Sequence, residues 1–251
     1  MNRNDVTIFN FSGIYESEDF YRKAENPRFI SCKEITGTNC ICDEYAQNAL
    51  LHLMEERKCP SEGIHFIDSG NYHYLSELLI RRLKEPVTLL LFDHHPDMQP
   101  PAFGDILSCG SWVKNALDKG ENVKQVIAIG VDKALADKVD PQYHDRVRFY
   151  QIEDCIRQDG IMRLPQEPSF PIYLSVDKDV IAETELCTNW DQGDMQSKEL
   201  FALLRYMIRH YKVTGADVCG ECAPDQDSNM REDAISRSSR WNEQILSILM
   251  Q

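Results

Sequence analysis

The sequence predicts an α/β protein, a three-layer α/β/α sandwich around a central, mostly parallel sheet. Short apolar, β-branched runs alternate with longer amphipathic stretches along the whole chain of 251 residues. Several of these runs are apolar at successive positions, as strands covered by helices on both faces must be. No linker, repeat or low-complexity tract interrupts the alternation. We therefore expect a single domain spanning residues 1–251.

The alternation predicts the elements in order along the chain. The apolar runs predict eight strands, at 6–11, 28–35, 63–69, 87–93, 123–130, 147–152, 171–177 and 213–221. The amphipathic stretches predict five helices, at 43–57, 72–84, 109–119, 197–211 and 231–250. The proline-containing segment 163–171 is the most loop-like part of the chain, but strands continue beyond it.

Composition and charge exclude several classes of partner. The formal net charge of −14 would repel nucleic acid and anionic membranes, so we expect neither as a partner. No apolar run approaches the roughly 18 residues of a membrane span, and the N-terminus lacks a signal-peptide core. The nine cysteines are scattered. Without a secretion signal, they are interpreted as reduced thiols in a cytoplasmic protein.

Metal-binding residue types gather where predicted strands end. In "LLLFDHHPD" the apolar run leads directly into Asp93, His95 and Asp97, and "PIYLSVDKD" ends with Asp177 and Asp179. Residues i and i+2 of an extended chain point to the same side. Each group is therefore expected to face one way, and the intervening His94 and Lys178 the other way.

Two more strand ends carry candidate site residues. "FIDSGNYHY" places His73 shortly after a strand, and "GADVCGECAP" places Glu221 after another. Ligands of parallel sheets bind at the carboxyl ends of strands, where these segments would meet. Four aspartates and two histidines would give the site a carboxylate charge of −4. Two divalent cations that share bridging carboxylates would neutralise this charge.

These segments together resemble the ureohydrolase superfamily of arginases, agmatinases and formiminoglutamases, which use binuclear manganese. The family pattern is a glycine-rich turn with a histidine, Asp-x-His-x-Asp, Ser-x-Asp-x-Asp, and a late glutamate followed by a proline. "SGNYHY" matches the first part loosely, "DHHPD" and "SVDKD" match in full, and "ECAP" supplies Glu221 and Pro224. The segment "GTNCICDEYA" is also similar to small uncharacterised bacterial members. The resemblance covers roughly residues 63–225.

The resemblance implies an arginase-like fold and two Mn²⁺ ions per chain. Its ligand set assigns one ion to His73, Asp93, Asp97 and Asp177. The second ion is assigned to His95, Asp93, Asp177 and Asp179. Such oxygen-rich ligation with two imidazoles suits manganese.

The resemblance also implies a reaction. A metal-bridging hydroxide would cleave a linear C–N bond in a guanidino, amidino or formimino compound. Glu221 would pair with the cationic part of this small-molecule substrate. Family members are often trimers or hexamers, so a homo-oligomer is possible.

The chain departs from arginases at one position of the pattern. Arginases carry a proton-shuttling histidine about a dozen residues after the metal motif, whereas this chain has Ser108, Cys109 and Gly110 there. This is closer to the Ser-Gly-Thr form of formiminoglutamases. Cys109 could transfer protons only if its pKa were shifted, so packing at a helix start is the favoured interpretation. "CGEC", with Cys219 and Cys222, is interpreted as incidental.

Two rival functions remain open from the sequence. The "DHH" motif also occurs in manganese-dependent phosphoesterases, but "FNFSGIYESEDF" lacks the earlier aspartate pair that these enzymes need. A metal-binding arginase-like protein without turnover is the other alternative. Trp112 and Trp190 are either walls of a substrate pocket or ordinary packing residues.

Overall fold

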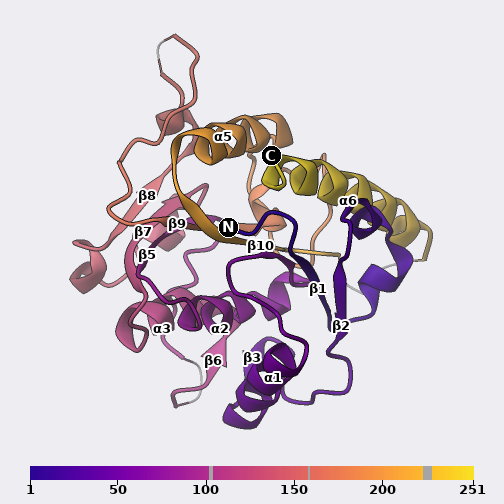
Figure 1. Cartoon of the computed structure of the whole chain (residues 1–251). Coiled ribbons are helices and arrows are strands. Elements are labelled where there is room, and N and C mark those ends of the chain that lie inside the picture. The colour runs from indigo at the N-terminus through magenta and orange to yellow at the C-terminus, as the bar shows by residue number, and fades with distance from the viewer. Residues whose placement is uncertain (102–103, 158, 223–227) are drawn as a thin grey trace.

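One eight-stranded sheet runs through the centre of the molecule. The computed structural model describes residues 1–101, 104–157, 159–222 and 228–251. The strands of the sheet are β1 (Val6–Asn10), β2 (Arg28–Ser31), β4 (Ile64–Phe66), β5 (Val87–Phe92), β7 (Val123–Ile129), β8 (Val147–Tyr150), β9 (Ile172–Asp177) and β10 (Val213–Cys219). They lie in the order β2-β1-β4-β10-β9-β5-β7-β8, and all neighbouring strands are parallel (Figure 1). The predicted fold class and all eight predicted strands are confirmed.

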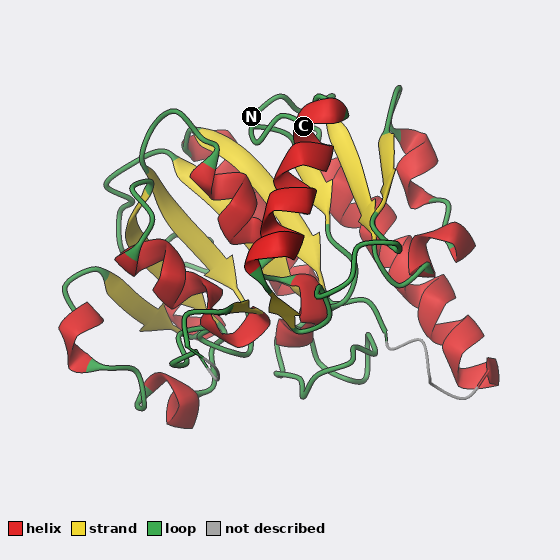
Figure 2. Cartoon of the chain, turned by 90° about the horizontal axis from the view of Figure 1, so that it is seen from below, coloured by secondary structure: helices red, strands yellow, loops and turns green. Residues whose placement is uncertain are grey.

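Helices cover both faces of this sheet (Figures 1 and 2). One face carries α1 (Glu44–Glu56), α2 (Leu75–Arg81) and α3 (Trp112–Asp118), and the other carries α5 (Ser197–His210) and α6 (Ser228–Leu249). All five predicted helices are present. Two of them are shorter than predicted. The 3₁₀ helices η3 (Gly70–Tyr72) and η4 (Cys109–Ser111) precede α2 and α3, and α2 also ends at Arg81, before the predicted end at residue 84.

Several short elements were not predicted from the sequence. They are the helix α4 (Lys133–Ala136) and an antiparallel pair of strands, β3 (Ile41–Cys42) and β6 (Leu107–Ser108). Strands of two residues carry no periodicity that a sequence pattern could show. The remaining 3₁₀ helices are η1 (Ile14–Ser17), η2 (Phe20–Lys23), η5 (Pro141–Tyr143), η6 (Ile152–Cys155) and η7 (Lys178–Val180).

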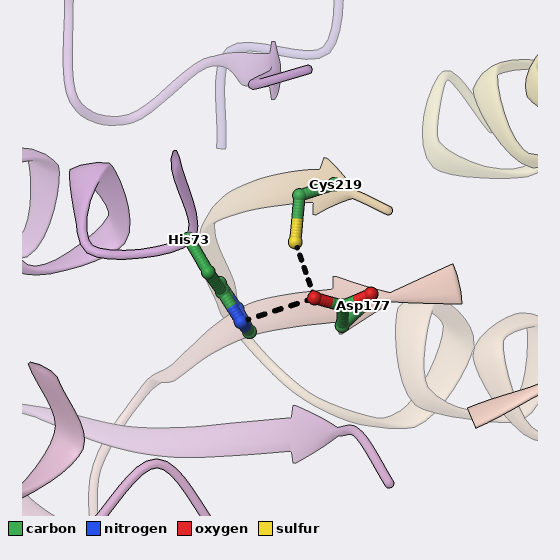
Figure 3. Close-up of side chains that lie close together, drawn as sticks. All are labelled: His73, Asp177 and Cys219. Atoms are coloured by element: carbon green, nitrogen blue, oxygen red, sulfur yellow. Dashed lines mark hydrogen bonds and ion pairs between the residues drawn. The ribbon is translucent and has the colours of Figure 1, made fainter. Parts of the chain in front are cut away.

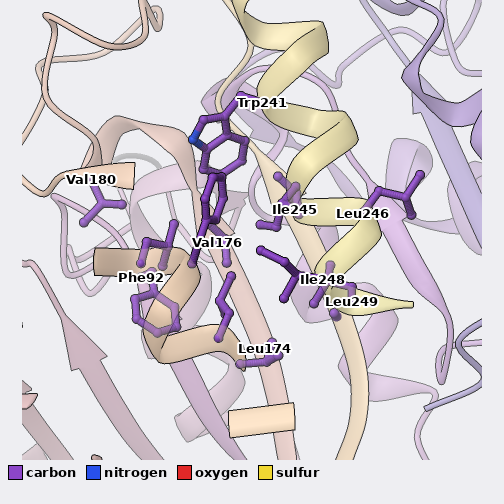
Figure 4. Close-up of a cluster of buried hydrophobic side chains, with 14 of the residues drawn as sticks. Phe92, Leu174, Val176, Val180, Trp241, Ile245, Leu246, Ile248 and Leu249 are labelled. Carbon is purple, nitrogen blue, oxygen red and sulfur yellow. The ribbon is translucent and has the colours of Figure 1, made fainter. Parts of the chain in front are cut away.

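The strands divide their side chains between two hydrophobic clusters. On β5, Leu90 and Phe92 belong to the cluster under α5 and α6, whereas Leu89 and Leu91 belong to the cluster on the side of α1, α2 and α3. Successive strand residues point to opposite faces, so burial of all four requires a helical layer on each side. Figure 4 shows the first cluster, where Trp241 and its neighbours on α6 lie over strand residues including Phe92, Leu174 and Val176.

The longer helices begin where the sequence supplies caps. The Asp43 carboxylate accepts a hydrogen bond from the Ala46 amide at 2.8 Å, which satisfies one free donor of the first turn of α1. Gln196 and Glu199 form a reciprocal capping box at the start of α5. In the part of the chain that the structure describes, no helix has both the length and the apolar character needed to cross a bilayer.

Candidate metal centre

The strand order explains why distant motifs meet. Strands β4, β10, β9 and β5 are consecutive neighbours in the middle of the sheet. All four are parallel, so their carboxyl ends lie at one edge, where ligands of open α/β sheets bind. The segments that follow β4, β9 and β5 carry His73, the Asp177–Asp179 pair and the Asp93–Asp97 motif. The structure thus brings all six predicted metal ligands to one edge of the sheet.

His73 lies among three carboxylates. Its Nδ1 is 3.0 Å from Asp97 Oδ2, 3.3 Å from Asp93 Oδ2 and 3.4 Å from Asp177 Oδ2. The four side chains are all buried. His73, Asp93 and Asp97 bring donor atoms within 4.8 Å of one another, a spacing that can hold a metal ion.

A hydrogen-bond chain sets the orientation of the His73 ring. The Ser175 hydroxyl donates to Asp217 Oδ1 at 2.7 Å, so its oxygen is free to accept from His73 Nε2 at 2.9 Å. A proton on Nε2 leaves the lone pair of Nδ1 directed at the carboxylates. Metal-binding histidines are commonly held in this way, by a partner on the nitrogen that does not bind the ion.

A second group forms around His95. Its Nδ1 lies 2.9 Å from Asp179 Oδ2 and 3.6 Å from Asp93 Oδ1, and these three residues also satisfy the spacing of a metal site. Asp93 therefore belongs to both groups, with one oxygen toward each histidine. Asp177 contacts the His73 group through Oδ2, while its Oδ1 accepts the Asp179 amide at 3.0 Å.

Asp97 is held by its own backbone and by Trp112. Its φ of 48° lies in the left-handed region, which turns the chain after the motif. The Trp112 indole donates to Asp97 Oδ2 at 2.6 Å, and its ring lies 4.9 Å from the ring of His73. Trp112 is fully buried, so it supports the two candidate ligands from the core and does not line a pocket.

Burial and crowding change the pKa values of the site. Burial, followed by the charge of Asp93, raises the pKa of Asp179 to about 6. Burial alone would lower the pKa of His95, but hydrogen bonds with Asp179 and Asp93 outweigh it and raise the pKa to about 12. Burial would also lower the pKa of His73, but Cys219 and the hydrogen bonds with Asp93 and Asp97 outweigh it and raise this pKa well above its usual value. The carboxylates thus favour positive charge at both imidazoles, as they would favour a cation placed between them.

One acceptor in the centre has no hydrogen-bond donor. Asp93 Oδ2 is buried and accepts no hydrogen bond among the described residues, although His73 Nδ1 lies 3.3 Å away. A buried carboxylate oxygen without a donor is costly unless it binds a cation. The donor set and this oxygen therefore fit a metal ion.

The candidate ligands open into a cavity of about 290 Å³. Its walls come from the ends of β5 and β9, from the β3 and β6 segments, and from Trp190. All six candidate aspartate and histidine ligands line it, together with uncharged groups. The described lining residues are Cys40, Ile41, Gly70, His73, Asp93, His95, Asp97, Gln99, Ser108, Cys109, Gly110, Asp177, Asp179 and Trp190. Trp190 is 41% exposed and its indole donates to Asn71 Oδ1 at 3.0 Å, so it forms a wall at the rim.

Glu221 does not lie where the sequence analysis expected it. Its carboxylate is fully buried, forms an ion pair with Lys178, and accepts hydrogen bonds from Ser238 and Asn242 of α6. Burial opposes its ionisation, but the charge and hydrogen bonds of Lys178 and α6 keep the pKa of Glu221 below its usual range. Glu221 is not among the residues that line the cavity. Its position therefore gives no support to the expected pairing with substrate.

A glycine turn separates Glu221 from the cavity. Gly220 has a φ of +93°, and a Cβ at this position would lie 2.5 Å from Asp177 Oδ1, so both conformation and space favour glycine. On one side of the turn Cys219 points at the metal centre, where its Sγ donates to Asp177 Oδ2 at 3.0 Å (Figure 3). On the other side Glu221 points toward α6. Pro224, the last residue of the predicted motif, lies outside the described residues.

Cys109 lines the cavity but has an unreactive environment. It is partly exposed, and its amide donates to the Cys40 carbonyl at 2.9 Å. Burial, followed by the charge of Asp97, raises the pKa of the Cys109 thiol. A thiol with a raised pKa is a poor proton carrier near neutral pH, which agrees with the favoured packing interpretation.

Sequence reasoning missed the residues that support the ligands. The Ser175–Asp217 pair carried a usable signal, because alternate residues on neighbouring strands share a face. The position of Cys219 at the carboxyl end of a central strand was also a usable signal. The sequence analysis instead interprets the Cys-x-x-Cys spacing of Cys219 and Cys222 as incidental. The ion pair of Lys178 with Glu221 had no local signal, because it joins two segments 43 residues apart.

Comparisons with known proteins agree with this geometry. The model of the arginase family matches residues 63–241. An uncharacterised protein of Thermotoga maritima is 30% identical over 245 residues, which cover 97% of this chain and 89% of that protein. The chain belongs to the arginase family.

Solved structures show the same fold at lower identity. Proclavaminate amidino hydrolase from Streptomyces clavuligerus superposes with a TM-score of 0.66 at 15% identity, covering 98% of this chain and 92% of that one. Formimidoylglutamase from Bacillus subtilis superposes with a TM-score of 0.63 at 12% identity, covering 97% and 86%. The predicted arginase-like fold is therefore confirmed.

Proposed function

We propose that this protein is a metal-dependent hydrolase that cleaves a linear C–N bond in a small guanidino, amidino or formimino compound. One observation carries the proposal. Four aspartates and two histidines from three separate segments converge on one cavity, and the Nδ1 atoms of both histidines face carboxylate oxygens. Membership of the arginase family supports a hydrolase of this class.

The proposed centre holds two Mn²⁺ ions. His73, Asp93, Asp97 and Asp177 would hold one, and His95, Asp93, Asp177 and Asp179 the other. Two divalent ions match a carboxylate charge of −4, and the oxygen-rich donors of these two sets favour manganese. When bound, the ions supply Lewis acidity, which activates water near neutral pH and polarises the substrate.

The chain itself orients the candidate ligands and encloses the substrate. The Ser175–Asp217 pair orients the His73 ring, and Trp112 holds Asp97 in place. The cavity of about 290 Å³ limits the substrate to a small molecule. The charged side chains of the described lining are the candidate ligands themselves, and no lysine or arginine is present there to bind an anionic substrate. The proposed function does not require a contact between substrate and Glu221.

The same lining argues against a phosphoesterase. Enzymes that bind phosphate usually place arginine or lysine near it. The described residues that line the cavity include neither. Loss of turnover with retained metal binding is a different alternative, and it makes a distinct prediction, metal uptake without any product.

Product detection separates these possibilities. Manganese-loaded protein is incubated with a panel of guanidino, amidino and formimino compounds, and urea, ammonia and formamide are measured. Asp177→Asn is the matched inactive control, because it removes one candidate ligand with little change of shape. We expect release of one of these products from at least one compound, and none from the control. Hydrolysis of a phosphodiester without any C–N cleavage would overturn the proposal.

A further inference from the structure

Cys219 lies beside the candidate metal centre. Its thiol is fully buried at the end of β10, in register with Asp177 on β9. The Sγ atom lies 3.0 Å from Asp177 Oδ2, and Cys219, Asp177 and His73 bring donor atoms within 4.8 Å of one another. Figure 3 shows the three side chains pointing toward one another from three separate segments.

The other cysteines have different surroundings. Several of the nine contact backbone carbonyls or hydroxyls within the described residues. Cys32, for example, donates to the Ile30 carbonyl, and Cys59 to the Thr7 hydroxyl. Of the nine, Cys219 alone belongs to a group of candidate metal donors in the part of the chain that the structure describes.

A second observation points to a cation at this place. Asp93 Oδ2 is buried and accepts no hydrogen bond from any described residue, and it is directed at the same His73 Nδ1 that Asp177 approaches. Cys219 is not among the cavity-lining residues, so its sulfur approaches His73 and Asp177 from the protein interior, whereas the cavity opens beyond them.

We propose that Cys219 is a thiolate ligand of the metal ion held by His73 and Asp177. The inference rests on the proposed function, since it requires the metal centre. On binding, the thiol proton passes to solvent and the sulfur forms a bond to the ion, with no change of oxidation state. The ion is then held by one sulfur, one nitrogen and carboxylate oxygens from Asp93, Asp97 and Asp177.

This ligand makes the two metal positions unequal. The His95 position has nitrogen and oxygen donors only, and suits a hard ion such as manganese. The His73 position gains a soft donor, which favours zinc, cobalt or iron there over manganese. The centre is therefore suited to a mixed pair of ions, and the preference for manganese applies chiefly to the His95 position.

Cobalt binding tests this inference without a substrate. Metal-free protein is titrated with Co²⁺, uptake is followed by calorimetry, and the sulfur-to-cobalt charge-transfer band is recorded in the near ultraviolet. The variants are Cys219→Ser, with Cys109→Ser as the control for the thiol in the cavity and Cys222→Ser as the control for a buried thiol outside it.

We expect the band in the wild-type protein and in both control variants, and its loss in Cys219→Ser. Removing the ligand should also weaken Zn²⁺ binding by roughly 10–100-fold relative to Mn²⁺. If Cys219→Ser does not fold, X-ray absorption of the zinc-loaded wild-type protein replaces it, with sulfur scattering expected at about 2.3 Å.

The outcomes distinguish this inference from the proposed function. Metal uptake without a charge-transfer band or sulfur scattering overturns the role of Cys219 and leaves the hydrolase proposal standing. A band that disappears in Cys109→Ser and persists in Cys219→Ser also overturns it. Failure of the wild-type protein to bind any divalent ion would reject both.

Discussion

Two buried charged clusters lie side by side at the carboxyl end of β9, and they are completed in different ways. Asp177 and Asp179 point into the metal centre, whereas Lys178 between them points to Glu221 and α6. The Lys178 cluster contains its own cation, and Glu221 also accepts hydrogen bonds from Ser238 and Asn242. The candidate metal centre has four carboxylates, and one of its acceptors, Asp93 Oδ2, has no donor among the residues that the structure describes. The charge of Glu221 is thus balanced within the chain by Lys178, whereas the excess of carboxylates in the candidate metal centre is one that an added cation would balance.

The two clusters should respond in opposite ways to loss of a carboxylate. Asp93 and Asp97 repel each other when no ion is present, and this repulsion, after burial, raises the pKa of Asp93. Removing one of these charges relieves repulsion. Removing Glu221 instead leaves Lys178 buried without a counter-charge, which is costly with or without metal.

The largest effect is expected at Asp93. Asp93→Ala should abolish binding of both ions and all activity, because Asp93 has one oxygen near each histidine. Asp97→Ala should mainly weaken binding of the ion at the His73 position. In chelated protein, Asp93→Ala relieves repulsion from Asp97 but also removes hydrogen bonds to His73 and His95, so its effect on the melting temperature through charge should be smaller than that of Glu221→Gln. Elemental analysis and thermal unfolding with and without chelator measure these effects, and full occupancy of both positions in Asp93→Ala would contradict the shared role.

A large loss of stability is expected at Glu221. Glu221→Gln should lower the free energy of unfolding by about 3–5 kcal/mol, because Lys178 stays buried without its partner. Urea unfolding in the presence of chelator measures this without a contribution from metal. The double variant Lys178→Met, Glu221→Gln should recover much of the loss, since no buried charge is left unpaired.

A matched control for this pair lies on the surface. Lys212 and Glu85 are 3.2 Å apart and both are 69% exposed. Glu85→Gln should change stability by less than about 1 kcal/mol, as is usual for exposed pairs. If Glu221→Gln lowered the free energy of unfolding as little as Glu85→Gln, the ion pair with Lys178 would not explain the position of Glu221. A contact between Glu221 and substrate would then be favoured.

A smaller effect, dependent on pH, is expected at Glu18. Its Oε2 accepts a hydrogen bond from Asn242 at 2.9 Å, and burial, followed by the charge of Glu221, raises the pKa of Glu18 well above its usual range. The folded state therefore retains a proton that the unfolded chain releases above about pH 4.5. This group's contribution to stability is fully present below that pH and is lost as the pH rises toward the folded pKa.

Glu18→Gln tests this sign. The variant is neutral at every pH, so its stability relative to wild type should increase with pH across that window, by up to about 1.4 kcal/mol per pH unit. Unfolding in urea at several pH values measures the slope. Glu16→Gln, at an exposed neighbour paired with Lys33, is the control and should show no such gain. A wild-type advantage that grows with pH would contradict the protonated state of Glu18.

The smallest effect is expected at Cys109. If the thiol only packs, Cys109→Ser should lower catalytic efficiency less than about threefold, without moving the pH profile. A proton-transfer role would cost the 10²–10⁴-fold typical of a general acid or base. Steady-state kinetics against pH decide between these outcomes, once a substrate is known.

The two clusters also differ in how much of each could be predicted from the sequence. The alternation of strands and helices predicted the sheet, and the i, i+2 rule correctly placed Asp177 and Asp179 on one side and Lys178 on the other. The position of Glu221 could not be predicted. It depends on the turn at Gly220 and on a partner helix that follows later in the chain, and neither leaves a periodic signal at Glu221 itself.

The residues that support the candidate ligands could not be predicted for a similar reason. The sequence shows Ser175 only as part of a motif. Its hydrogen bonds with His73 and Asp217 can be predicted only when β10 is known to lie beside β9. Cys219 becomes notable only when its neighbour in register is known to be Asp177. Local patterns thus identified the charged ligands, while pairing of distant strands determined which other residues reach them.

The metal content of the purified protein tests the central claim most directly. Protein stripped with chelator and then supplied with manganese should hold about two divalent ions per chain, because four carboxylates and two imidazoles form two adjoining donor groups. Ion binding at 100-fold above its dissociation constant should stabilise the fold by about 2.7 kcal/mol for each site, so chelation should lower the melting temperature. Less than about half an ion per chain, with no change in melting temperature on chelation, would contradict the metal centre itself.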